Sequence, residues 1–118
     1  MKLSISRNQS DVKGFFGGHK GVMFKLTAKA AITNEERALI ERYKVSSYVL
    51  VSYNLKNAKG DQVEQFVTVQ ALIDGLSVDT DSVQTLLELE KKCKESCQNL
   101  KDLLSVMSTF GGQEVFEI

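Results

Sequence analysis

Apolar and polar residues alternate along the N-terminal part of the chain, and this pattern predicts two β-strands. In residues 2–6, Leu3 and Ile5 alternate with polar neighbours, and residues 22–31 repeat the pattern with lysines on one face. Successive side chains of a strand point to opposite faces, so each of these strands has one face suited to a core. Residues 7–21 between them are polar and rich in glycine, and we expect a loop there.

A capping box predicts that a short helix begins after Thr33. The Thr33 hydroxyl can accept a hydrogen bond from the Glu36 amide, while the Glu36 carboxylate accepts one from the Thr33 amide. Leu39, Ile40 and Tyr43 form the apolar stripe of this helix, which should end near Tyr43.

The middle of the chain predicts a hairpin followed by two short elements. Residues 47–55 are rich in β-branched and aromatic side chains, and residues 63–70 alternate in the manner of a return strand. The turn chemistry lies in residues 56–61. Residues 71–75 should form one helical turn that ends at a glycine, and residues 76–78 should add a short edge strand.

A long amphipathic helix is predicted from about residue 82 to about residue 108, and a short terminal strand at Val115, Phe116 and Ile118. Seven residues of the helix keep a spacing of three and four that is interrupted at Glu90: Val83, Leu86, Cys93, Cys97, Leu100, Leu104 and Met107. The element order is then strand, strand, helix, strand, strand, strand, helix, strand. This order predicts an α+β fold, a single globular domain over residues 1–118 with a mainly antiparallel sheet and the long helix across one face.

Composition supports a globular chain and adds one asymmetry. The 118 residues carry no net charge and are 42% hydrophobic, close to globular averages. Residues 1–31 hold six basic residues and one acidic residue, so the remaining chain is acidic. No apolar run is long enough to cross a bilayer or to serve as a signal peptide, which leads us to expect no membrane association.

The cysteine pattern favours a reducing compartment. Cys93 and Cys97 lie four residues apart in the predicted helix, where their Cβ atoms are about 5–6 Å apart. A disulfide needs about 3.5–4.5 Å, so we expect free thiols that pack as small hydrophobes. This pair and the distant His19 are too few ligands for structural zinc, so we expect no metal or other cofactor. The free thiols lead us to expect a cytoplasmic location.

A glycine-rich segment inside the basic N-terminal part is the candidate ligand site. Glycines bring backbone amides close to an anion, lysines add charge, and adjacent phenylalanines can stack on a base. The candidate contact residues are Lys13, Phe15, Phe16, Gly17, Gly18, His19 and Lys20. The alternative is an ordinary turn between strands, since neither a P-loop nor a dinucleotide-binding fingerprint is present.

The long helix suggests a second function, self-association. Its apolar seam can pair with a second copy, and the candidate interface residues are Leu86, Cys93, Cys97, Leu100 and Leu104. The alternative is that the chain's own sheet covers the seam. Since no catalytic motif accompanies the single histidine, the sequence favours a small protein-interaction or assembly module that binds itself or another protein. The other hypothesis is binding of nucleic acid or a phosphorylated ligand through the basic loop and strands.

Overall fold

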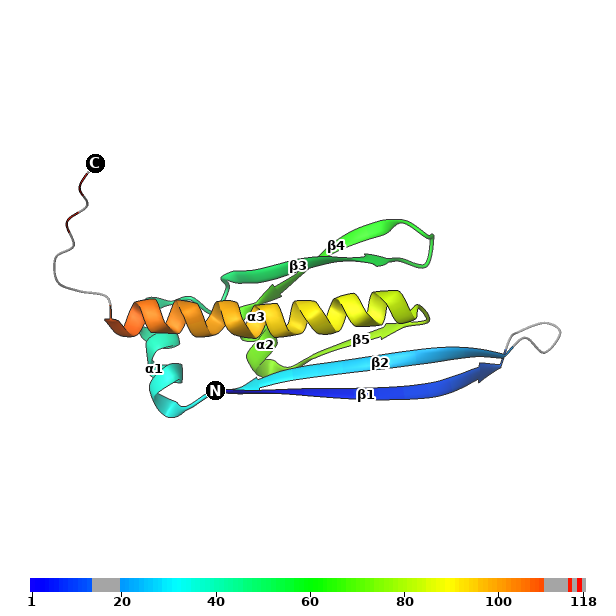
Figure 1. Cartoon of the computed structure of the whole chain (residues 1–118), viewed down its shortest axis with the longest axis horizontal. Helices are drawn as coiled ribbons and strands as arrows, with labels where there is room; N and C mark the ends of the chain where they lie inside the picture. Colours follow the sequence, from blue (N-terminus) through cyan, green and yellow to red (C-terminus); the bar gives the residue numbers. More distant parts are fainter. Residues whose placement is uncertain (14–19, 110–114, 116, 118) are drawn as a thin grey trace.

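The computed structural model describes residues 1–13, 20–109, 115 and 117 (Figure 1). It is an α+β fold with antiparallel pairing and one long helix, as the sequence predicts. The elements are β1 (Lys2–Lys13), β2 (Lys20–Ala31), α1 (Asn34–Tyr43), β3 (Val49–Lys56), β4 (Gln62–Thr68), α2 (Val69–Asp74), β5 (Leu76–Thr80) and α3 (Val83–Thr109).

The strands form two separate sheets. β1, β2 and β5 make a three-stranded antiparallel sheet in the order β1-β2-β5, while β3 and β4 make a two-stranded hairpin. The alternation predicted for β2 is confirmed, because Leu26, Ala28 and Ala30 are all buried on one face. The opposite face of this sheet carries the exposed Lys25 and Lys29.

Helix α3 lies between these two sheets, with the β3–β4 hairpin on one side and the three-stranded sheet on the other (Figure 1). Leu89 and Cys93 of the helix pack against Leu26 and Ala28 of β2, and Tyr53 of β3 closes the same cluster from the hairpin side. The expectation of one sheet with the helix across a single face is therefore wrong. The hairpin has its own apolar face, and that face is also buried against the helix.

A second cluster fills the region around the helix C-terminal half. Leu100 and Leu104 of α3 pack there with Ile40 of α1 and Leu72 of α2, and the cluster shares the half-buried Leu3 and Tyr53 with the first one. The short helices are held by their caps. The Glu36 amide donates to Thr33 Oγ1 at 3.1 Å and the Thr33 amide to Glu36 Oε1 at 2.9 Å, which confirms the predicted capping box.

The first hairpin is longer than the sequence predicts. Residues 7–13 and 20–21 are strand rather than loop, with Lys13 paired directly to Lys20. The side chains from Asn8 to Asp11 are all exposed, so no core-facing periodicity marks the strand, whose backbone is held by cross-strand pairing. The long hairpin contributes to an elongated molecule of 69 × 35 × 19 Å.

The end of the chain departs from expectation in a smaller way. Val115 and Glu117 lie outside any strand, and Phe116 and Ile118 lie outside the described residues, so the predicted terminal strand is not found in the part that the structure describes. Both short elements before α3 are present, but their boundaries differ from the prediction: Val69 and Gln70, expected in the return strand, begin α2 because Thr68 caps that helix. Helix α2 ends at Asp74 with Gly75 as its C-cap at a φ of 99°, and β5 follows at the sheet edge.

Candidate binding groove between β3 and α3

One edge of strand β3 has no neighbouring strand, and its hydrogen-bonding pattern identifies which residues face outward. The Asn57 amide donates to the Asp61 carbonyl at 2.9 Å across the turn. Along an antiparallel strand, successive residues direct their backbone amide and carbonyl alternately toward the paired strand and away from it. The amides and carbonyls of Tyr53 and Leu55 therefore point toward β4. The amides and carbonyls of Ser52 and Asn54 consequently point away from β4.

The start of β3 forms a hydrogen bond with α3. The side-chain amide of Asn99 donates to the carbonyl of Leu50, which lies in the register shift between Val49 and Val51, at 2.7 Å. Beyond this contact, the described residues provide no hydrogen-bond partner for the outward backbone groups of Ser52 and Asn54. The open edge of β3 therefore presents free donors and acceptors along the side of α3.

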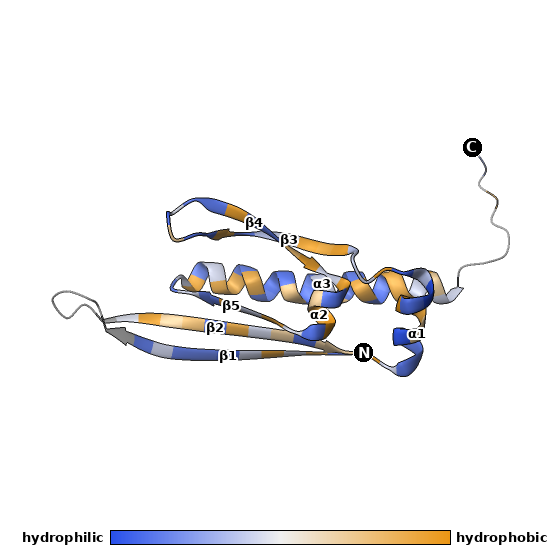
Figure 2. Ribbon diagram, turned by 180° about the vertical axis from the view of Figure 1, so that it is seen from behind, coloured by the Kyte–Doolittle hydropathy of each residue, from blue (hydrophilic) through white to orange (hydrophobic). Residues whose placement is uncertain are grey.

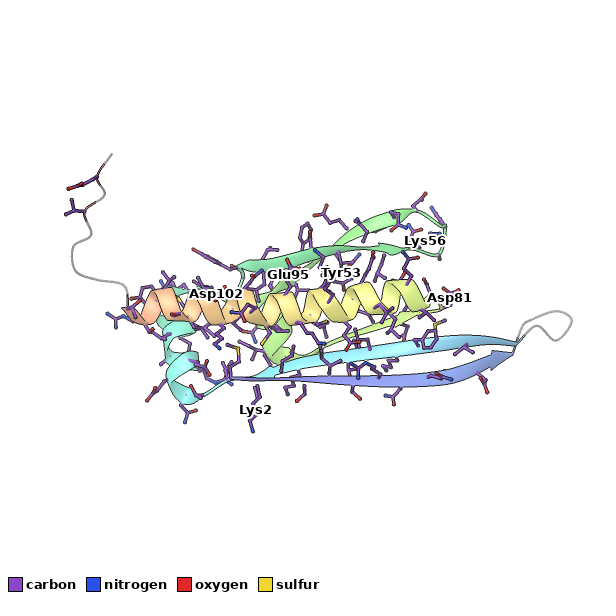
Figure 3. The ribbon with its side chains drawn as sticks, viewed as in Figure 1. Lys2, Tyr53, Lys56, Asp81, Glu95 and Asp102 are labelled. Atoms are coloured by element: carbon purple, nitrogen blue, oxygen red, sulfur yellow. The ribbon has the colours of Figure 1, made fainter. Side chains whose placement is uncertain are left out.

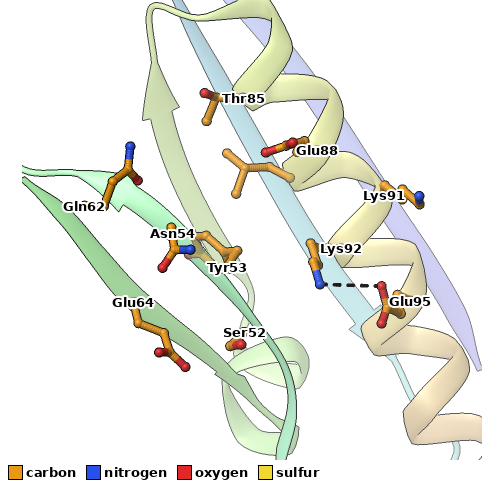
Figure 4. A pocket seen from close by; sticks show the side chains of 11 residues that line it. Ser52, Tyr53, Asn54, Gln62, Glu64, Thr85, Glu88, Lys91, Lys92 and Glu95 are labelled. Atoms are coloured by element: carbon orange, nitrogen blue, oxygen red, sulfur yellow. Dashed lines mark ion pairs between the residues drawn. The ribbon is translucent and has the colours of Figure 1, made fainter.

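A groove lies along this edge (Figure 4). Its volume is about 660 Å³, and Ser52, Tyr53 and Asn54 form the wall on the β3 side. The opposite wall is the exposed flank of α3. Four of its residues recur at spacings of three and four and so share one stripe of the helix. They are Thr85, Glu88, Lys92 and Glu95.

The groove continues past the tip of the hairpin. A second hollow of about 630 Å³ shares Asn54, Gln62 and Thr85 with the first, and reaches the β5–α3 connection. Gly60 keeps the hairpin turn tight there with a φ of 85°, which side chains larger than hydrogen rarely adopt. The two hollows together form one channel that runs beside residues 52–56 of β3.

Acidic side chains outnumber basic ones along the channel. The lining residues include five acids and three lysines, a net charge of −2: Asp79, Asp81, Glu64, Glu88 and Glu95 against Lys56, Lys91 and Lys92. One of these acids, Asp79, stands opposite Lys25 of β2, so its charge is partly offset. One ion pair is formed within it, Lys92 to Glu95 at 3.8 Å. Both partners are partly exposed, so the pair is easily exchanged for contacts to a ligand. The channel favours a ligand with positive charge.

The floor of the groove is less polar. Leu89 is buried there, and Tyr53 lies between β3 and the helix (Figure 3). Burial raises the pKa of the Tyr53 hydroxyl, with a smaller contribution from Cys93. Burial likewise raises the pKa of the Cys93 thiol to about 11, so this thiol is protonated at neutral pH.

The structure describes only some of the residues that the sequence predicts as ligand contacts. Lys13 and Lys20 are the last and first residues of β1 and β2 and stand directly opposite each other. Phe15, Phe16, Gly17, Gly18 and His19 lie outside the described residues. The structure thus shows the base of this proposed site as a hairpin and leaves its ligand contacts as predictions.

The residues predicted as an oligomer interface contribute to the protomer's own core. Cys93, Leu100 and Leu104 are buried in the two clusters, while Leu86 and Cys97 are half-buried beside them. These side chains lie against the chain's own sheets and short helices, which is the alternative that the sequence left open. Leu89 and Ser96, which the predicted seam omits, are buried with them, and Ser96 Oγ donates to the Cys93 carbonyl at 2.7 Å.

Sequence reasoning did not single out Ser52 and Asn54. Polar residues on the outward positions of a hairpin are common, and nothing in the pattern says which edge of a strand stays unpaired. The available signal was the hairpin itself, because a two-stranded sheet always has two open edges.

Two further observations concern other classes of site. In residues 1–13 and 20–109, no three His, Cys, Asp or Glu side chains gather as metal ligands. None of the helices described is both long enough and apolar enough to span a membrane. Comparison with family models, with curated proteins and with solved structures finds no match to this chain. The function is therefore argued from the groove.

Proposed function

We propose that this protein is a protein-interaction module that binds an extended segment of a partner protein in the channel between β3 and α3. The observation that carries the proposal is the open edge of β3, whose outward backbone groups at Ser52 and Asn54 line the channel. A peptide added to such an edge gains main-chain hydrogen bonds, and pockets beside the edge select its side chains.

Size and charge define the class of segment. Residues 52–56 span about 16 Å at about 3.3 Å per residue, enough to pair with a segment of about five residues. The net negative charge of the channel favours Lys or Arg side chains in that segment. Its apolar floor at Leu89 accepts one aliphatic or aromatic side chain between them. The partner is another protein, or a second copy of this chain.

The cysteines support a cytoplasmic location for this activity. Cys93 and Cys97 are both free thiols, and both lie on the protein's own packed helix rather than at the channel. Free thiols are retained where the surroundings are reducing. We place the interaction in the cytoplasm on this ground.

The test is a selection of random twelve-residue peptides displayed on phage against immobilised protein. Proline at position 52 removes an amide that faces the channel and leaves the bonds to β4 intact, because edge strands tolerate proline where the amide points outward. Its matched control is proline at Phe66, the residue directly opposite Ser52, whose amide faces the far edge of β4.

We expect basic peptides to be enriched on the wild type and on Phe66→Pro, and to lose at least tenfold in affinity for Ser52→Pro. Equal binding of the selected peptides to all three proteins would remove the channel as their site. Circular dichroism of both variants verifies that the hairpin is retained.

One observation favours the alternative, binding of nucleic acid or a phosphorylated ligand. Lys2, Lys25 and Lys29 are exposed on the outer face of the three-stranded sheet. Lys25 stands opposite Asp79 on β5, whose carboxylate offsets part of the positive potential of this face. Anisotropy of labelled single-stranded DNA and RNA at about 50 and 200 mM salt tests this alternative, because phosphate contacts weaken steeply with salt.

A further inference from the structure

Strand β1 is a long and regular edge strand, and no described strand pairs with its outer edge. It runs for twelve residues, Lys2–Lys13, and pairs with β2 on one side only. Its register with β2 is continuous and contains no bulge, and the strand has no proline. Natural edge strands are usually short, bulged or covered, so a long regular edge is a ready template for another strand.

Helix α3 exposes two apolar side chains on the stripe whose Glu90 contacts β1. Val83 is 56% exposed and Leu87 61% exposed. Together with Glu90 they recur at spacings of four and three, so the three residues share one stripe of the helix. Glu90 accepts from Arg7 Nε of β1 at 3.1 Å, which places this stripe on the β1 side of the sheet.

The directions of α3 and β1 show which residues of β1 lie at the same height along the sheet as Val83 and Leu87. Helix α3 runs opposite to β1 (Figure 1), so the residues that precede Glu90 lie alongside those that follow Arg7. Val83 and Leu87 are thus level with the stretch from Asn8 to Asp11. Figure 2 shows that this part of β1 is hydrophilic.

The charges of β1 select one register for pairing with a second copy. Two identical antiparallel strands pair about a twofold axis. The helix-facing side chains of both copies stay on one face of the joined sheet only when odd-numbered residues stand opposite odd-numbered residues. With the axis at Gln9, Arg7 stands opposite Asp11 of the other copy at both ends. With the axis at Arg7 the two guanidinium groups oppose each other. Cross-strand pairs of opposite charge stabilise a sheet, and like charges destabilise it.

We propose that two copies of this chain associate through antiparallel pairing of their β1 strands about a twofold axis at Gln9. The product is a continuous six-stranded sheet in which both α3 helices lie on one face. Each helix packs against its own β2, and the two β2 strands are three strand spacings apart, about 14 Å.

This surface is separate from the channel at β3, so the two proposals stand or fall independently. Substitutions in β1 leave Ser52 and Asn54 unchanged, and a protein that dimerises without selecting peptides supports this inference alone.

A cysteine at the axis tests the register directly. Directly opposite residues have Cβ atoms about 4.5–5.5 Å apart, so Gln9→Cys brings two thiols within reach of a disulfide after a small adjustment. Ser6→Cys is the matched control, because Ser6 is exposed on the same strand and takes no part in the Arg7–Asp11 pairs. In the proposed dimer its two copies are six residues apart along the strands, about 20 Å, which is too far to bridge.

We expect sedimentation of the wild type to show a dimer at tens of micromolar, and mild oxidation to cross-link Gln9→Cys but not Ser6→Cys. A second variant, Asp11→Arg, opposes Arg7 of the other copy and should raise the dissociation constant at least tenfold while leaving the circular dichroism unchanged. A monomer at these concentrations, or equal cross-linking at positions 6 and 9, would overturn the proposal.

Discussion

Replacement of Leu100 by alanine tests whether the seam of α3 is the protomer's core. Leu100 has 0% exposure and packs with Leu72 and Ile40, so no solvent reaches the space that the substitution empties. Leucine-to-alanine changes at such sites cost about 2.7–5 kcal/mol, because transfer free energy is lost and a cavity remains. We expect a loss in this range in the free energy of unfolding.

The thermal effect follows from the size of the chain. The entropy of unfolding is about 2.1 cal/mol/K per residue, or about 0.25 kcal/mol/K for 118 residues. A loss of about 2.7–5 kcal/mol then lowers Tm by about 10–20 °C. Circular dichroism melts measure this shift, and urea titrations measure the free energy itself.

The control and the concentration dependence make the test specific. Val106 lies on the same helix and is 58% exposed, so Val106→Ala should change the stability by less than about 0.5 kcal/mol. The Leu100→Ala loss should be the same at low and high protein concentration. A loss below about 1 kcal/mol, or one that appears only at high concentration, would refute the assignment of this residue to the protomer's core.

Three further predictions concern the ion pair, the thiol and the cap. The hydrogen bond from Arg7 lowers the pKa of Glu90, so its carboxylate stabilises the fold above its ordinary pKa of 4.5, and this contribution is lost as pH falls through the lowered value. Glu90→Gln should flatten the acid side of a stability-against-pH curve from urea titrations, and an unchanged curve would contradict the pairing. The pKa of Cys93 is raised to about 11, so iodoacetamide should label it at neutral pH far more slowly than in urea; equal rates by mass spectrometry would place this thiol outside the core. Thr33→Ala removes the cap of α1 and should cost about 1 kcal/mol of stability by urea titration, whereas no loss would mean that the capping box is not formed in solution.

The sequence predicts the elements that face a core. In β2 and α3, apolar residues recur with the period of the structure because one side of each element is buried. The predicted helix from about residue 82 to 108 accordingly matches α3, Val83–Thr109, to within one residue at each end. The capping box at Thr33 and the glycine after α2 are equally local signals, and both lie where the pattern places them.

The sequence does not predict features that depend on pairing alone. Residues 7–13 have exposed side chains from Asn8 to Asp11, so their strand is specified by the β2 backbone and leaves no hydrophobic period. Pattern also does not show that β3 and β4 form a sheet of their own on the other side of α3. The candidate channel follows from that arrangement, which is why Ser52 and Asn54 were not among the predicted site residues.

The measurement that tests the central claim most directly is amide hydrogen exchange of β3 by NMR, with and without a selected basic peptide. In the free protein, the amides of Ser52 and Asn54 should exchange much faster than those of Val51 and Tyr53, which face β4. Peptide binding should then protect Ser52 and Asn54 as new main-chain hydrogen bonds form. Slow exchange at both positions in the free protein, or peptide binding that leaves them unprotected, would contradict the account.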